Sequence, residues 1–280
     1  MLQNKMLRNI AFNIFPESVI DKIRYWRFSH RLSKVLKKIK EDKKYFTDRL
    51  LDFYDEDVIA GAFSEFYELE MNIIPEVLSE DPKVILDIGA NYGQVTSYLS
   101  IFYPNSKIYA FEPVQRTFKI LKKIKQKFNL KNVELIKKGM GEKKEKKTII
   151  LPDKYTILAY VLNEGYKTNS KDDHEKIEID TLDNFIEENK IRQVDFIKCD
   201  IEGYELHMLK GAINTLRKFK PIVFMEIEER HTKKYGINPN EVLKFLKGFG
   251  YECYGAFDSL SIKRMKEINE NVPLYFFIPK

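Results

Sequence analysis

Cysteine is scarce in this sequence, and no long hydrophobic run is present. The 280 residues contain only two cysteines, Cys199 and Cys253, and each lies within a short apolar run. Two such residues favour buried free thiols over a disulfide framework, which indicates a reducing compartment. No apolar stretch approaches the length of a membrane span, and the N-terminus shows no clear signal-peptide cleavage site. We therefore expect a cytoplasmic protein with one main domain and an appended element.

Basic residues are concentrated at the N-terminus. Residues 1–50 hold 13 Lys and Arg residues against five Asp and Glu residues, a balance of +8, whereas the remainder carries −2. Apolar residues recur there at near-helical spacing with basic residues between them, which predicts a basic amphipathic helix. Such a helix either packs on the catalytic domain with a solvated basic face or contacts a membrane surface or another polyanion. We assign residues 1–75 to this helical extension and residues 76–280 to the catalytic domain.

The segment KVILDIGANYGQ, residues 83–94, joins a buried-strand pattern to a turn that contains two glycines. Its apolar run favours a β-strand, and Asp87 lies near the end of that strand. Gly89 and Gly93 let the backbone turn tightly and approach a ligand closely before a helix begins near Gln94. A strand, a glycine turn and a helix in this order are typical of the first unit of a doubly wound α/β sheet, which binds a nucleotide-like cofactor.

A second motif supports the cofactor site and helps to choose the cofactor. The apolar run KIYAFEP places Glu112 at the end of a second strand, where a carboxylate accepts hydrogen bonds from both hydroxyls of a ribose. Dinucleotide sites use G-x-G-x-x-G, but Asn91 stands here in place of the second glycine, which disfavours a pyrophosphate and hence a dehydrogenase. S-adenosylmethionine has no phosphates, and its adenosine and amino-acid ends suit Glu112, Asp87 and the amides of the turn.

Five segments together resemble a known family: DIGANYG, FEP, TLDNF, IKCDIEGYELHMLKGA and PIVFMEIE. In this order and spacing they are similar to the FkbM-type S-adenosylmethionine-dependent methyltransferases. The resemblance covers Val84–Glu228, and its D-x-E-G-x-E segment is the most specific part. It implies a Rossmann-like class I fold with a seven-stranded, mostly parallel sheet whose last strand is antiparallel. It also implies methylation of a hydroxyl group, often on sugars or polyketide-like natural products, so the expected partner is a carbohydrate acceptor.

Further elements complete the cofactor side. The run after Pro113 predicts the crossover helix to a third strand, VELIKKG. Met140 follows where an adenine ring can pass, or else fills the core. Residues 143–180 predict an inserted set of hairpins and loop, which either forms part of the acceptor cleft or is solvated. Thr181 or Asp180 is expected to cap the next helix. The predicted cofactor-binding residues are Asp87, Gly89, Asn91, Gly93, Glu112, Pro113 and Met140.

The predicted catalytic residues are the carboxylates Asp200, Glu202 and Glu226. Asp200 ends the fourth strand, VDFIKCD, and Glu226 lies on the fifth, so both meet the cofactor crevice at the carboxyl edge of the sheet. Methyl transfer to a hydroxyl needs alignment and a base within hydrogen-bond reach. A carboxylate of D-x-E-G-x-E is favoured as that base, then Glu226, and His231 is read as a surface histidine. Oxygen ligands at these positions leave a divalent metal open, and no metal is assigned.

Glutamates of the D-x-E-G-x-E segment also have a structural interpretation. Glu202 and Glu205 bracket the first turn of the helix that follows the fourth strand. Acidic side chains at that place stabilise a helix through its macrodipole, without any part in catalysis.

Two rival functions are tested by the same segments. A nucleic-acid base methyltransferase fits the basic N-terminus, but enzymes of that type typically end the fourth strand with an N-P-P-Y-like segment. This chain has CDIEGYE at that place, so no nucleic-acid partner is expected. A non-catalytic, cofactor-binding scaffold would keep every cofactor residue, but the acidic fourth-strand segment argues for chemistry.

Overall fold

The computed structural model shows strands and helices that alternate along the chain. The residues it describes are 73–75, 77–78, 81–152, 159–163, 172–256, 262–269, 272 and 274–280. All of them belong to one compact unit, residues 62–280. The basic helix predicted near the N-terminus lies outside the described residues.

Eight strands form the main sheet of the described residues, in the order β11-β10-β12-β9-β8-β1-β2-β3. β1, β2, β3, β8 and β9 are parallel, and β12 is antiparallel to both of its neighbours. This arrangement confirms the predicted fold class. β11 is an additional edge strand that the sequence did not reveal, because its four residues, IKRM, carry no apolar alternation. The strand bounds are β1 Val84–Ile88, β2 Lys107–Phe111, β3 Val133–Ile136, β8 Phe196–Cys199, β9 Ile222–Glu226, β10 Tyr251–Ala256, β11 Ile262–Met265 and β12 Leu274–Pro279.

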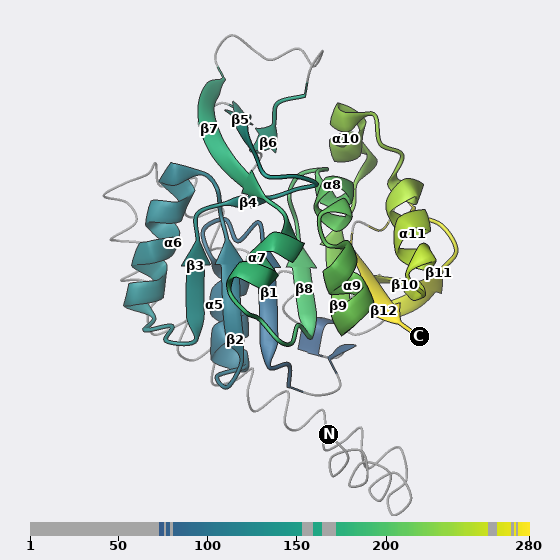
Figure 1. Cartoon of the computed structure of the whole chain (residues 1–280), viewed down its shortest axis with the longest axis horizontal. Coiled ribbons are helices and arrows are strands. Elements are labelled where there is room, and N and C mark those ends of the chain that lie inside the picture. Colours follow the sequence, from purple (N-terminus) through teal and green to yellow (C-terminus); the bar gives the residue numbers. More distant parts are fainter. Residues whose placement is uncertain are drawn as a thin grey trace, which may run out of the picture. The chain divides into compact units, whose positions relative to one another are not determined.

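Helices cover the sheet, and α7 and α9 cross one face of it (Figure 1). Side chains at alternate positions of the parallel strands, such as Leu86, Ile197 and Val223, share one hydrophobic cluster with apolar residues of α7, α8, α9 and α11. The intervening positions point to the opposite face, as the two-residue period of a strand requires. The helices are α5 Gln94–Phe102, α6 Gln115–Lys127, α7 Leu182–Glu188, α8 Glu205–Lys210, α9 Ile213–Phe219, α10 Glu229–Thr232, the 3₁₀ helix η3 Lys233–Tyr235 and α11 Pro239–Gly248.

The strand order reverses between β1 and β8. From β1 the chain proceeds outward to β2 and β3, and it later returns to the other side of β1 to form β8 and β9. Ligands of open α/β sheets bind outside the carboxyl ends of the strands at such a reversal. The topology therefore directs attention to the residues that follow Ile88 and Cys199.

A second sheet of four strands, in the order β4-β7-β5-β6, is built from the described part of residues 139–180. Its strands are β4 Gly139–Met140, β5 Glu145–Leu151, β6 Tyr160–Val161 and β7 Asp173–Asp180. The antiparallel pairing of β5 with β6 and β7 confirms the predicted hairpins. Apolar residues of this sheet pack with Val114 and Tyr204, which lie beyond the carboxyl ends of β2 and β8. The second sheet thus borders the edge where the predicted site residues lie.

The helix after β7 is capped by Thr181. Its side chain accepts a hydrogen bond from the amide of Asn184, at 3.1 Å. Asp180 instead accepts from the amide of Thr181 and from the Asn184 side chain, each at 2.9 Å. Of the two predicted caps, Thr181 is therefore the N-cap, and Asp180 supports it from the preceding position.

Candidate active site

The turn between β1 and α5 has a left-handed backbone at three positions. The φ angle is +80° at Gly89, +48° at Asn91 and +89° at Gly93. The amide of Gly89 donates to the carbonyl oxygen of Phe111, at 3.1 Å, which anchors the turn on the end of β2. A methyl group at position 89 would overlap the carbonyl oxygen of Asp200. Glycine is therefore required at position 89 by its φ angle and by the close approach of the residue after β8.

Glu112 connects the end of β2 to this turn. Its Oε2 accepts a hydrogen bond from the amide of Asn91, at 3.0 Å, and its Oε1 accepts one from the amide of Val114, at 2.8 Å. Only 6% of the residue is exposed. Burial raises the pKa of the Glu112 carboxyl to about 7, although the two backbone donors oppose the rise.

Two polar groups here have hydrogen-bonding capacity that a ligand can use. Oδ1 of Asn91 is buried and accepts no hydrogen bond from the described residues, a condition that costs about 1–3 kcal/mol until a donor arrives. The Glu112 carboxylate has further lone pairs besides those used by its two backbone donors. Hydroxyl groups of a ribose, or an ammonium group, fit this set of acceptors.

Pro113 and Met140 lie on the border between this site and the second sheet. Pro113 is partly buried, and a methyl group placed at Gly139 would be 3.7 Å from its Cγ. Met140 is 2% exposed and its side chain belongs to the main hydrophobic cluster. The geometry therefore gives the Met140 side chain a packing role, and a contact with an adenine ring stays a prediction.

A buried lysine links the turn between β1 and α5 to the end of β8. We call this turn, residues 89–93, the cofactor turn, because the sequence predicts a cofactor there. Asp87 and Lys198 are register partners on β1 and β8, so their side chains point to the same face. Nζ of Lys198 lies 3.9 Å from Asp87 Oδ1, 3.3 Å from Asp200 Oδ2 and 3.3 Å from the carbonyl oxygen of Gly89. Asp87 also accepts a hydrogen bond from the Thr96 hydroxyl. One ammonium group thus compensates a fully buried carboxylate and holds two strand ends together.

Glu205 closes the turn that leads from β8 into α8. Its Oε1 accepts hydrogen bonds from the amides of Ile201 and Gly203, both at 3.1 Å, and 1% of the residue is exposed. Gly203 has a φ angle of +98°, and a methyl group there would overlap the carbonyl oxygen of His231. Of the glutamates in D-x-E-G-x-E, Glu205 therefore has the structural role, and Gly203 lets the segment after β9 approach.

Stability should depend on pH through Glu205. Burial raises the pKa of its carboxyl to about 7 from an ordinary value of 4.5. Because the folded value lies above the unfolded value, this group favours folding fully below pH 4.5, and that contribution is lost as the pH rises to about 7. We expect Glu205→Gln to remove up to about 3 kcal/mol of the fall in unfolding free energy between these pH values. Urea unfolding of both proteins at pH 4.5 and pH 8 measures this difference. An equal fall in both would contradict the burial of a titrating carboxyl.

Acidic side chains gather where β8 and β9 end. Asp200 follows β8, and its side chain is 31% exposed. Burial, together with the charges of Asp200 and Glu228, raises the pKa of the Glu226 carboxyl to about 9. The pKa of Glu228 is lowered against the effect of its own burial, because Arg230 and Glu226 donate hydrogen bonds to it. Of these two carboxyl groups, Glu226 is therefore the one that favours the proton, and Glu228 is the one that favours the negative charge. No three His, Cys, Asp or Glu residues of the described chain are grouped as metal ligands.

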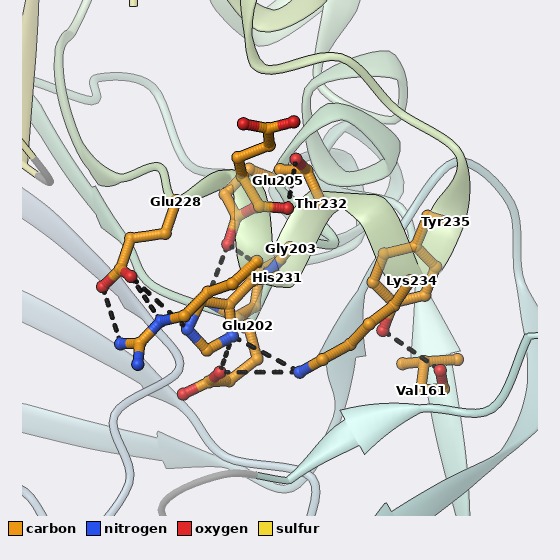
Figure 2. A network of polar contacts seen from close by, with 12 residues as sticks. Val161, Glu202, Gly203, Glu205, Glu228, His231, Thr232, Lys234 and Tyr235 are labelled. Carbon is orange, nitrogen blue, oxygen red and sulfur yellow. Dashed lines mark hydrogen bonds and ion pairs between the residues drawn. The ribbon is translucent and has the colours of Figure 1, made fainter. Parts of the chain in front are cut away.

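Glu202 contacts a histidine from the next segment (Figure 2). Its Oε2 is paired with Nδ1 of His231, and Nζ of Lys234 lies 4.0 Å from the same oxygen. On the other side of the ring, Nε2 of His231 is 3.9 Å from Oε2 of Glu228. Glu202 has a φ angle of +58°, unusual for a residue with a side chain. The turn therefore holds this carboxylate in a strained position, directed at the imidazole.

Comparison with known families identifies the fold and the motifs. The model of the family described as the methyltransferase FkbM domain matches residues 87–253, more than half of the chain. The chain belongs to the FkbM methyltransferase family. The match includes the cofactor turn, Glu112, the D-x-E-G-x-E segment and the carboxylates after β9. It assigns these residues to a methyltransferase domain, as the sequence resemblance implied.

Several known proteins are similar to this FkbM domain. A protein named methyltransferase 1 from Beauveria bassiana (strain ARSEF 2860) is 27% identical over 146 residues, which are 47% of this chain and 59% of that protein. An FkbM methyltransferase from Methylobacillus flagellatus KT has a TM-score of 0.49 at 16% identity, over 86% of this chain and 60% of that chain. An rRNA methylase from Streptococcus thermophilus has a TM-score of 0.39 at 13% identity, over 77% and 93%. The chain spans about three fifths of the length of the first two.

Some residues of this FkbM site were not recognised from the sequence. Lys198 is one, although a lysine inside the apolar strand VDFIKCD was a visible signal. Glu228, the last residue of the segment PIVFMEIE, and Lys234 are others, because their contacts depend on the fold of the segment after β9. The structure brings Asp87, Lys198 and Asp200 together, as was expected of the two carboxylates.

None of the helices in the described part of the chain has the length and hydrophobicity of a membrane span.

Proposed function

We propose that this protein transfers the methyl group of S-adenosylmethionine to a hydroxyl group of a carbohydrate, in a glycan, a glycolipid or a related natural product. The observation that carries the proposal is the contact between the two motifs. Gly89 of the cofactor turn lies against the backbone of Asp200, the first residue of D-x-E-G-x-E. A cofactor on that turn is thereby adjacent to a row of carboxylates suited to hold hydroxyl groups.

The residues on the cofactor side fit an adenosine better than a pyrophosphate. Asn91 offers a buried acceptor, and Glu112 a buried carboxylate beside it, and neither is compatible with a phosphate group at the same place. Gly89 and Gly93 supply the freedom that the turn needs, and its amides are suited to a carboxylate end. We assign Asp87 and Lys198 the role of stabilising the conformation of the turn. We assign Pro113 to the outer side of the cofactor site.

The acceptor side favours a neutral, hydroxyl-rich molecule. Asp200, Glu202, Glu226 and Glu228 all lie at the ends of β8 and β9 or just beyond. Carboxylates accept hydrogen bonds from sugar hydroxyls and repel phosphates, so the edge is poorly suited to a nucleic-acid backbone. Contact with a membrane through the basic N-terminal region, which lies outside the described residues, stays a prediction.

The chemistry asks mainly for alignment and for a proton acceptor. S-adenosylmethionine, when bound, supplies a methyl carbon made electrophilic by a positively charged sulfur. The protein's task is to direct one acceptor oxygen at that carbon and to receive its proton. Asp200 is placed to orient the acceptor because its carboxylate is partly exposed and is fixed by Lys198, at 3.3 Å. Burial and the neighbouring acidic groups raise the pKa of Glu226, which favours its protonated form and a role as a hydrogen-bond donor or a proton reservoir.

Removal of the Glu112 carboxylate should weaken cofactor binding. We expect Glu112→Ala to lower the affinity for S-adenosylmethionine by about 1–3 kcal/mol, because charge-assisted hydrogen bonds to the ribose are lost. Since burial raises the pKa of Glu112 to about 7, wild-type affinity should fall as the pH drops below that value, and the variant should show a flatter dependence. Calorimetry between pH 5.5 and pH 8 measures both effects. Unchanged affinity at pH 8 would show that Glu112 is misassigned.

The acceptor class can be found without knowing the acceptor. Purified full-length protein and S-adenosylmethionine labelled in its methyl group are incubated with cell-extract fractions of polysaccharide, glycolipid, nucleic acid and small molecules. We expect base-stable label in a carbohydrate-containing fraction, with wild-type protein and much less with Glu112→Ala. Label in nucleic acid alone would refute the proposal, as would the absence of transfer to every fraction.

A further inference from the structure

We propose that His231 is the general base of the reaction and that Glu202 is the residue that positions it. This inference rests on the proposed function and refines the roles of the acidic residues. The sequence favoured a carboxylate of D-x-E-G-x-E as the base and read His231 as a surface histidine. The structure instead places the imidazole between two carboxylates, with 12% of its side chain exposed.

The turn after β8 is shaped to bring Glu202 to the imidazole. Glu202 adopts a left-handed φ angle, and Gly203 lets the carbonyl of His231 approach where a side chain would collide. Glu205 fixes the same turn from inside through two backbone amides. The left-handed Glu202, the glycine at position 203 and the buried Glu205 thus all support the contact between Glu202 and His231. A solvated ion pair on the surface would not need such support.

The contacts around the ring favour one tautomer. In the tautomer that we propose, Nδ1 carries a proton that faces the paired Glu202 carboxylate, and the lone pair of Nε2 is left to accept the proton of a hydroxyl. The charged groups near the ring are Glu202 and Glu228 on opposite sides, Lys234 with its Nζ 3.3 Å from Nδ1, and Arg230, which is bonded to Glu228 at 2.9 Å. The rival arrangement has Lys234 donating to Nδ1 and a proton on Nε2, which could not act as a base.

The other acidic side chains at this edge already have partners or other roles, so they are less suited to act as the base. Asp200 is paired with the buried ammonium of Lys198, and the raised pKa of Glu226, caused first by its burial, favours a form that already carries a proton. Glu228, 3.9 Å from Nε2, carries the negative charge that would stabilise the imidazolium.

In the transfer, the bond between the acceptor oxygen and the methyl carbon forms as the sulfur–carbon bond breaks. The electron pair of the sulfur–carbon bond stays on sulfur, and the hydroxyl proton moves to Nε2. The proton then leaves to solvent with the product.

The tautomer can be measured without any acceptor. Full-length protein labelled with ¹⁵N contains four histidines, and the ring signals of His231 are assigned by their loss in His231→Gln. Long-range ¹H–¹⁵N spectra at pH 8 should show Nδ1 protonated and Nε2 unprotonated. In Glu202→Gln the Nδ1-protonated form should lose its dominance. A wild-type ring protonated on Nε2 would overturn the proposal, whatever the activity.

The rate of transfer tests the catalytic role, with the labelled extract fraction as acceptor. At saturating S-adenosylmethionine, His231→Gln should lower turnover by about 10²- to 10⁴-fold and abolish the acidic limb of the pH–rate profile, while calorimetric affinity for S-adenosylhomocysteine is unchanged. Glu202→Gln should lower turnover by at least about tenfold, and Glu202→Asp, which tolerates a left-handed φ angle, should restore part of it. The control is Glu229→Gln, which makes the same chemical change at another carboxylate. Glu229 lies on α10, the helix that contains His231, and is paired with Lys233.

The outcomes separate this inference from the proposed function. Near wild-type turnover in His231→Gln, or an unchanged acidic limb, would refute His231 as the base even if sugar methylation is observed. Equal losses in Glu202→Gln and Glu229→Gln would refute a specific positioning role. An Nδ1-protonated ring with no labelled fraction would support the paired tautomer and refute the proposed acceptor chemistry.

Discussion

Lys198→Met is expected to lower the free energy of unfolding by about 3–5 kcal/mol, because it removes the cation beside a buried carboxylate while the carboxylate stays. Asp87 is fully buried, Lys198 is 4% exposed, and the two are register partners on adjacent strands. The same substitution also releases Asp200 and the carbonyl oxygen of Gly89, so affinity for S-adenosylmethionine should fall with stability. Urea unfolding and calorimetry measure the two effects.

A matched control is available for this prediction. Lys210 is also paired with a carboxylate, Glu142 at 3.7 Å, but its side chain is 39% exposed. Lys210→Met should therefore change stability by less than about 1 kcal/mol. The double variant Asp87→Asn with Lys198→Met should be more stable than Lys198→Met alone, since it no longer buries an uncompensated charge. Equal effects of the two lysine substitutions would contradict the bridging role of Lys198.

Gly89→Ala is expected to destabilise the protein by more than about 4 kcal/mol and to abolish detectable cofactor binding. Two causes add. A φ angle of +80° costs a residue with a side chain about 1–2 kcal/mol, and the new methyl group overlaps the carbonyl oxygen of Asp200. Since the overlapping atom belongs to the backbone, relief requires the end of β8 to move away from the turn. Thermal unfolding and calorimetry with S-adenosylmethionine test both parts.

Gly236→Ala separates the two causes. Gly236 has a φ angle of +66°, and a methyl group there would meet no atom within 4 Å. Its substitution should lower the free energy of unfolding by only about 1–2 kcal/mol, the cost of a left-handed φ angle for a residue with a side chain. It should leave cofactor affinity unchanged. If Gly89→Ala were no more destabilising than Gly236→Ala, the cofactor turn would not lie against the residue after β8.

Much of the fold was predictable because local sequence patterns indicate its strands, turns and helices. The apolar run before Asp87, the glycines of the turn and the amphipathic segment after Pro113 each have a period or a turn signal that reports one element. The edge strand β11 was missed because a short, half-exposed hairpin strand with two basic residues has no such period. The sequence predicted hairpins for the second sheet, but it did not predict how they pack. The residues that cover this sheet, such as Val114 and Tyr204, are distant from it in sequence.

The candidate site was predictable in position but not in detail. Strand ends in a parallel sheet converge, so the region of Asp87, Glu112 and Asp200 followed from topology. The partners of each side chain did not follow. Glu202 meets His231 only because Gly203 admits a backbone from 28 positions later, and Lys198 meets Asp87 only because of strand register. Such contacts arise from tertiary packing, which a single sequence does not reveal.

The most direct test of the account is a crystal structure of the full-length protein with S-adenosylhomocysteine. We expect the ligand beside the turn from Gly89 to Gly93, with its ribose hydroxyls bonded to the Glu112 carboxylate and the buried Oδ1 of Asn91 supplied with a donor. A ligand bound elsewhere, or a turn that stays empty at saturating ligand concentration, would contradict the assignment of this edge as a methyl-donor site.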